Sequence, residues 1–446
     1  MEQQSLKRTL SPWNVVIFGM IMMSPLAPFQ VFGSVAQASF GMVALVYLIG
    51  ATLMFFTALS YARFNREFPL AGSVYNYVGK GINQKVGYLA GWLMLSDYLL
   101  VPALMCLFSS LWLTGLFPNI DIKVIAIVFI VITGLINIRG IALNARVNTI
   151  LFVVQLTALA VFIAFMIKFV FIDGLGMGGF SLEPFFQAER IDMSFIATAV
   201  SIILLGFIGF DGISTLAEEV KDPERVMGKA TVTALLSTAL LFMTQSYLAS
   251  LTYTDYAGLD PDMALFDIAK TVGGEWFYIT MIIINVLAVG LAVTLNAQSA
   301  VSRVLFSMAR DKSLPFSTAL NKLHSKYKTP TNAIIFSMAI SVVLILFVDM
   351  NSILMLISFG ALTSFMVLNL AVIIYFFFKK KERGVKGFFF HLLFPLIGFL
   401  VCASVWFGFD KVTMLAGLSW LVVGVLVAIG VRSAKKGTQE VTETEK

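Results

Sequence analysis

Apolar runs long enough to cross a lipid bilayer recur along this chain and leave little room for a soluble domain. Hydrophobic residues make up 59% of the sequence and charged residues only 13%. A helix needs about 20 predominantly apolar residues to cross a bilayer. The runs therefore predict an all-α polytopic membrane protein with twelve spans, centred near residues 24, 53, 100, 130, 157, 205, 240, 291, 340, 365, 399 and 421. No small-residue cleavage site follows the first run, so we expect it to be a retained span.

The basic residues predict the orientation, because Lys and Arg accumulate in cytoplasmic loops. With the N-terminus inside, 26 of the 31 basic residues fall in inward segments and none falls within a span. The five outward ones are Lys123, Lys168, Arg190, Lys270 and Lys411. Both termini are therefore predicted to be cytoplasmic. This distribution also explains the net charge of +6 and removes the need for a nucleic-acid partner.

Two long connections predict how the spans are organised. Residues 63–85 follow span two on the inside, and residues 253–275 follow span seven on the outside. A repeat unit of five spans is odd, so its second copy must be inverted. The predicted parts are a cytoplasmic N-terminus (1–12), a first inverted repeat with spans 1–5 (13–172), a second with spans 6–10 (193–378), accessory spans 11–12 (388–431), and a polar, disordered cytoplasmic tail (432–446).

Two apolar runs are interrupted in the middle by residues that a plain membrane helix avoids. The first is Gly19 to Pro28, with Ser24, Pro25 and Pro28, and the second is Gly206 to Gly212. Proline removes a backbone donor, and interrupted spans at matching positions of two repeats indicate a transporter's binding site. A nucleophile with a base, or a metal cluster, would be expected of an enzyme. Neither is visible, and we expect no enzyme activity, cofactor or metal.

Two acidic residues are predicted to lie deep in the membrane, where a charge costs at least ~2.5 kcal/mol. Asp97 lies near the middle of span three, and Asp211 lies at the break in span six. Each has a structural alternative. Asp97 could be a protonated carboxyl bonded to a neighbouring helix, and Asp211 could cap the second half of its span.

The residues of the first break indicate whether it binds the carboxylate or the amine of a ligand. The backbone N–H groups that start a half-helix suit a carboxylate, and residues 23–27 would form that cradle. Pro25 has no N–H, which favours a ligand that is recognised through its amine. Phe207 and Phe210 flank the second break, where an aromatic ring could cover a cationic amine.

At several motifs the sequence resembles the amino acid, polyamine and organocation transporter superfamily, and within it the bacterial putrescine importers. The motifs are Gly19 to Gly33, FPLAGSVY from Phe68, GFDGISTLAEE from Gly209 with DPERV from Asp222, and VSRVLFSMARD from Val301. The resemblance implies a LeuT-type fold that binds substrate between spans one, three, six, eight and ten. It implies that Met23, Ser24 and Pro25 form the unwound part of span one, that Phe207 is an aromatic gate, and that Asp211 is the acidic position after the second break.

Two departures from the family pattern concern specificity and coupling. The importers have an aspartate where this chain has Gln30, and some proton-coupled relatives have a lysine in span five where this chain has Gln155. Protons would then pass through Asp97 or Asp211. Alternatively, sodium would be held by freed carbonyls with the hydroxyls of Thr294 or Ser299.

The sequence as a whole predicts a multi-pass carrier of the bacterial plasma or inner membrane. It would import a small putrescine-like amine by alternating access, coupled to protons, and the alternative is an amino-acid permease coupled to protons or sodium. An ion pair of Glu218 or Glu219 with Arg303 is considered as an inner gate, against a solvated charged surface. The residues predicted to bind substrate are Met23, Ser24, Pro25, Ala27, Asp97, Tyr98, Phe207, Gly209, Phe210 and Asp211.

Overall fold

A computed structural model describes residues 8–190 and 193–444 of the chain, and helix is the regular secondary structure of this part apart from one β-bridge between Leu10 and Val220. The α-helices of the first half are α1 Pro12–Met23, α2 Pro28–Ala38, α3 Val43–Glu67, α4 Val74–Gly81, α5 Gln84–Leu116, α6 Ile122–Ile138 and α7 Ile141–Ile167. Those of the second half are α8 Met193–Gly206, α9 Pro223–Thr252, α10 Ala264–Gly273, α11 Glu275–Val286, α12 Thr294–Arg310, α13 Ser317–Leu320, α14 Thr331–Phe347 and α15 Met350–Val372. The last are α16 Val385–Phe388, α17 Phe394–Phe407 and α18 Lys411–Thr444.

Short 3₁₀ and π segments join or extend these helices. The 3₁₀ segment η3, Phe210–Glu219, follows α8, and the π segment η5, Leu287–Val293, joins α11 to α12. The remaining ones are η1 Lys168–Ile172, η2 Ala188–Arg190, η4 Tyr256–Gly258, η6 Ile373–Lys379 and η7 Phe389–Leu393.

The prediction of a polytopic all-α protein is confirmed. Within the described ranges, eight helices are long and apolar enough to cross a membrane, or nine if the bent pair α1 and α2 is one span. The apolar helices α6 and α14 are shorter. All twelve predicted centres fall on helical elements or, for residue 24, on the break between α1 and α2.

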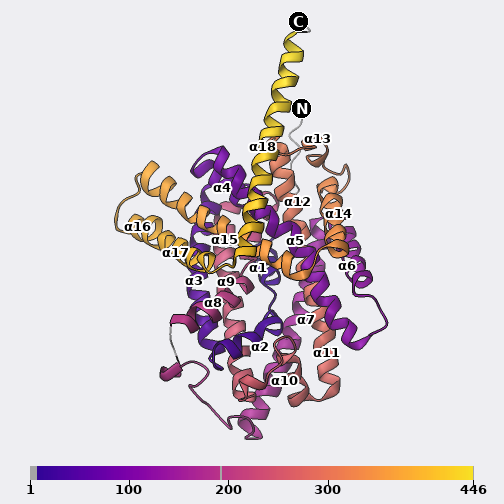
Figure 1. Cartoon of the computed structure of the whole chain (residues 1–446), viewed down its shortest axis with the longest axis vertical. Helices are drawn as coiled ribbons and strands as arrows, with labels where there is room; N and C mark the ends of the chain where they lie inside the picture. Colours follow the sequence, from indigo (N-terminus) through magenta and orange to yellow (C-terminus); the bar gives the residue numbers. More distant parts are fainter. Residues whose placement is uncertain (1–7, 191–192, 445–446) are drawn as a thin grey trace.

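Helices α4 and α10 lie at opposite ends of the bundle, and these ends are called the α4 end and the α10 end (Figure 1). Helix α5 starts directly after α4 and has 33 residues, which corresponds to about 50 Å and carries it through the bundle. Along the bundle α3 packs on α9, and α5 packs on α15.

Both predicted breaks are present. Helix α1 ends at Met23, Ser24 has a positive φ of 54°, and α2 begins at Pro28 with its axis bent by 51°. Proline suits the first turn of a helix, where its missing N–H needs no partner. In the second break, Gly209 has φ 130°, and a Cβ there would lie 2.8 Å from the carbonyl carbon of Met22. The two breaks therefore pass each other closely, which requires glycine.

Helix α18 is attached to the bundle by a reciprocal tryptophan pair. The indole nitrogens of Trp92 and Trp420 each donate to the other residue's carbonyl oxygen, at 2.9 and 3.0 Å. Contrary to the predicted disorder from residue 432 onward, the backbone of α18 stays helical to Thr444 and extends past the α4 end (Figure 1). The helix can continue through this polar segment because the segment contains no proline.

Candidate substrate site

A cavity of about 320 Å³ lies at the first break. Its walls come from α1, α2, α3, α5, α8, η5 and α15 and from the second break. Asp97 lies near the middle of α5, and Val101, Leu104 and Phe108 continue the wall toward the α10 end. Gln30 of α2, on the far side of the first break from α1, also lines the wall. The cavity therefore occupies the half of the bundle toward the α10 end.

Asp97 is the predicted carboxylate that reaches this cavity. Its side chain lines the wall, the residue is 1% exposed, and its Oδ1 has no hydrogen-bond partner in the described part of the chain. The alternative, a carboxyl bonded to a neighbouring helix, is not seen for this oxygen. An unpaired buried carboxyl oxygen is costly unless a cation or donor joins it, so Asp97 is suited to hold an ammonium group.

Asp211 is satisfied by the protein and is not part of the cavity wall. Its Oδ2 accepts a hydrogen bond from the hydroxyl of Tyr98, and its Oδ1 accepts one from the Gly209 N–H at 3.0 Å. The carboxylate thus binds the break that precedes it, rather than capping the helix that follows. Tyr98 joins the second break to α5 through this contact.

The backbone of the first break has few donors left for a ligand carboxylate. The N–H of Ser24 donates to Ile21 O and that of Ala27 to Ser24 O, both at 2.9 Å, and Pro25 has no N–H. The Pro25 carbonyl accepts from the side-chain amide of Gln245 at 2.9 Å. Met23, Ser24 and Ala27 line the cavity, as predicted, whereas Pro25 does not. The hydroxyl of Ser24 is buried without a partner among the described residues.

The two predicted aromatic residues lie behind the cavity wall in this conformation. Phe207 packs on Tyr47 and Phe242, with ring centroids 6.2 and 5.4 Å away. Phe210 packs on Tyr61 and on a phenylalanine of α15. Both are fully buried, and Tyr47 is the aromatic side chain of this group that lines the cavity. The structure thus separates Phe207 from the site that Asp97 occupies.

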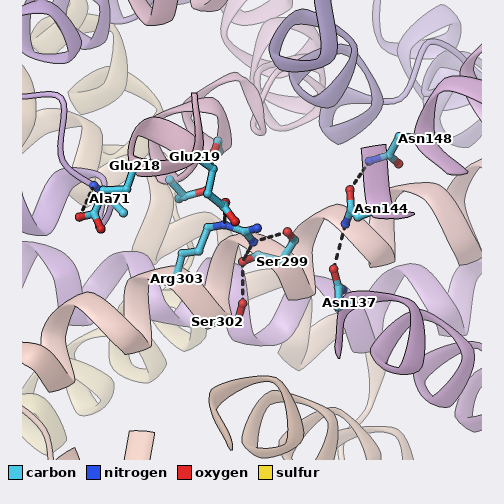
Figure 2. Close-up of polar contacts among 11 residues, drawn as sticks. Ala71, Asn137, Asn144, Asn148, Glu218, Glu219, Ser299, Ser302 and Arg303 are labelled. Carbon is cyan, nitrogen blue, oxygen red and sulfur yellow. Dashed lines mark hydrogen bonds and ion pairs between the residues drawn. The ribbon is translucent and has the colours of Figure 1, made fainter. Parts of the chain in front are cut away.

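A buried ion pair joins Arg303 of α12 to Glu219 of η3 (Figure 2). The Nε of Arg303 donates to Oε2 of Glu219 at 2.5 Å, and the two side chains are only 5% and 4% exposed. Arg303 also donates to the carbonyl oxygen and hydroxyl of Ser299. Counted along α12, Arg303 lies ten residues beyond the cavity residue Val293, or about 15 Å. The predicted pairing is present, and burial contradicts the alternative of a solvated charged surface.

The sequence placed Arg303 in an inward segment and did not predict that its side chain is buried. Arg303 belongs to the spanning helix Glu275–Arg310 and is 4% exposed. Glu219 neutralises it there, which makes a buried arginine tolerable. Ser299 is engaged with this arginine, and Thr294 lies 3.4 Å from the sulfur of Cys106. Neither hydroxyl lines the cavity.

A second ion pair and the start of the chain adjoin this buried pair. Glu218 pairs with Arg310 at 2.9 Å, on a more exposed surface, and its Oε1 also accepts the Ala71 N–H at 3.3 Å (Figure 2). The backbone N–H groups of Thr9 and Leu10 both donate to the Glu219 carbonyl oxygen, at 2.9 and 3.0 Å. The segment before α1 is thereby fixed to the end of η3.

A ladder of buried amides beside the ion pair was missed in the sequence. The side-chain amide nitrogen of Asn144 donates to Oδ1 of Asn137, and that of Asn148 donates to Oδ1 of Asn144 and of Asn296, at 2.5 to 2.8 Å (Figure 2). Asn296 then donates to the carbonyl oxygen of Phe18 in α1 at 3.4 Å. The ladder joins α6, α7, α12 and α1. Asn144 and Asn148 are four residues apart in one apolar run and share a face of α7, and that spacing was the available signal.

Comparisons with known proteins agree with this architecture. Residues 10–435 match the family model described as amino acid permease. The chain is 33% identical to the low-affinity putrescine importer PlaP of Escherichia coli K12, over 94% of this chain and 93% of that protein. It is 25% identical to the branched-chain amino acid permease BcaP of Bacillus subtilis, over 95% and 93%. It is 26% identical to the serine/threonine exchanger SteT of the same species, over 88% and 89%. The chain therefore belongs to the amino acid permease family of the amino acid, polyamine and organocation transporter superfamily, and it is a multi-pass bacterial membrane protein.

Proposed function

We propose that this protein imports a small amine, putrescine or a related polyamine, by alternating access driven by protons. The observation that carries the proposal is the unpaired Oδ1 of Asp97 in the cavity wall. The putrescine importer PlaP, a relative over nearly the whole chain, supports the same substrate class. An ammonium group of the substrate would pair with Oδ1 of Asp97. Binding of the substrate would therefore also offset the cost of burying this carboxylate.

The proposed topology has twelve spans in a five-plus-five inverted repeat and two accessory helices, with both termini cytoplasmic. A correspondence between the two long connections supports it. The connection after α3 contains the short helix α4, and the one after α9 contains the short helix α10, at the opposite end of the bundle (Figure 1). This is what inversion of one repeat requires. In that orientation the cavity lies in the outside half of the bundle, and we infer that Arg303 and Glu219 close the inside.

The alternative substrate is an amino acid. The relatives BcaP and SteT favour it. The geometry of the first break opposes it, because the N–H groups of Ser24 and Ala27 are already bonded and Pro25 has none. Few donors of this break therefore remain for a ligand carboxylate, among them the Ser24 hydroxyl. We therefore place the amine first.

Uptake of radiolabelled putrescine into proteoliposomes tests the proposal. An inward proton gradient should drive accumulation, and Asp97→Asn should abolish it. Asp349→Asn is the matched control, because Asp349 caps α15 outside the cavity. Full uptake by both Asp97→Asn and Asp211→Asn would refute the carboxylate roles. Competition by neutral amino acids with no competition by diamines would select the alternative, and accumulation that follows a sodium gradient instead would refute proton coupling.

A further inference from the structure

We propose that this site recognises one ammonium group attached to an apolar body, so that an unbranched aliphatic monoamine binds better than a diamine of equal length. The inference rests on the proposed function and narrows its substrate class. A diamine such as putrescine would then be carried with one ammonium bound to Asp97 and the other without a charged partner.

The charges of the cavity wall support a single anchor. Of the lining residues in the described part of the chain, Asp97 is the one with an acidic or basic side chain. The other polar side chains of the wall are neutral: Ser24, Gln30, Tyr47 and Ser358. Asp211 does not supply a second anchor, because its two oxygens are bonded to Tyr98 and Gly209 and it lies outside the wall.

The rest of the wall is apolar and suits an alkyl chain. From the level of Asp97 toward the α10 end, the lining side chains are Val101, Leu104, Met105, Phe108, Ile202, Ile208, Leu354 and Ile357. Each methylene buried against such a surface strengthens binding by about four-fold. A second ammonium at the same depth would lose its hydration without gaining an opposite charge. The two effects act in the same direction and favour the monoamine.

Gln30 is the residue that sets this preference. It lies on α2 at the start of the outward half of the cavity and is half-buried. Its side-chain amide belongs to the cavity wall and is neutral. Replacing it by a carboxylate of the same size would give the cavity the second anchor that a diamine needs.

Equilibrium binding to the purified full-length protein tests the inference with n-propylamine, n-butylamine, n-pentylamine and putrescine. Putrescine is isosteric with n-pentylamine, since one terminal methyl is exchanged for an ammonium. Affinity should rise about four-fold per methylene along the monoamines, and n-pentylamine should bind at least about ten-fold more tightly than putrescine. Asp97→Asn corrects for partition of the amines into detergent.

A variant pair makes the test specific to the cavity. Gln30→Glu should reverse the order and favour putrescine, whereas Gln37→Glu on the same helix should leave it unchanged. Gln37 is exposed, donates to the Leu259 carbonyl oxygen and does not line the cavity. Tighter binding of putrescine than of n-pentylamine by the wild type overturns the inference but leaves the proposed function intact. Binding of neutral amino acids with no binding of any amine overturns both.

Discussion

Replacing Arg303 by methionine should open the α4 end of the bundle. The pair with Glu219 is almost completely buried, and Arg303 makes two further hydrogen bonds to Ser299. Removal of one partner from a buried pair costs about 3–5 kcal/mol, because the other charge stays buried and unpaired. If the pair forms only while this end is closed, the substitution destabilises the closed state by that free energy relative to the open state. At 1.4 kcal/mol per factor of ten, the ratio of open to closed molecules rises at least about 100-fold.

The opening can be measured by thiol labelling. The two native cysteines, Cys106 and Cys402, are buried and are first replaced by alanine. A cysteine is then placed at Ser302, which neighbours Arg303 and is 1% exposed. A membrane-impermeant maleimide applied to the α4 side of inside-out vesicles should label it slowly in the parent and much faster with Arg303→Met.

Two controls separate the buried pair from general charge loss. Arg310→Met removes the exposed pair with Glu218, which is worth only about 0–1 kcal/mol, and labelling should barely change. The charge swap Arg303→Glu with Glu219→Arg should slow labelling relative to Arg303→Glu alone. Equal labelling of the Arg303→Met variant and its parent, or a swap that rescues nothing, would refute the reasoning.

Three further perturbations follow from the two breaks and the amide ladder. Gly209→Ala should prevent transport and lower the melting temperature, because its φ of 130° is strained for alanine and Met22 lies in the way; a variant with wild-type uptake would contradict the close approach of the breaks. Tyr98→Phe leaves Asp211 without one of its two bonds, so we expect about 1–3 kcal/mol of lost stability in urea unfolding, and an unchanged unfolding midpoint would show that this bond is not formed. Asn296→Ala should speed hydrogen exchange in α1, since it frees a main-chain oxygen there; unchanged protection would argue that the ladder does not restrain α1.

The sequence predicted those parts of the fold that depend on local chemistry. Proline and glycine located both breaks because they act on the backbone wherever they stand, and apolar runs located the helices because the bilayer sets their length. The burial of Arg303 was not predicted, because the rule that places Lys and Arg in cytoplasmic loops says nothing of the packing of a single arginine. Its partner Glu219 is 84 residues away, and such a pairing depends on packing that no local pattern carries.

The same limit applies to the candidate site. Asp97 and Asp211 were recognised together as deep carboxylates, but the sequence could not tell which one faces the cavity. The structure distinguishes them: Asp211 accepts a hydrogen bond from Tyr98, whereas Oδ1 of Asp97 has no partner among the described residues. Phe207 was assigned to the cavity from its place at the second break and from the resemblance, and its side chain packs between α3 and α9 in this conformation. Side-chain direction at a break depends on neighbours rather than on spacing.

The attachment of the chain's first described residues has a practical consequence for handling this protein. Thr9 and Leu10 share one acceptor, the Glu219 carbonyl oxygen, and Leu10 is 2% exposed. A movement of η3 would therefore also displace the segment before α1, or break these two hydrogen bonds. Affinity tags and fluorescent fusions are therefore better joined after Thr444 than ahead of Arg8, because the segment before α1 is bonded to Glu219, the partner of the buried arginine.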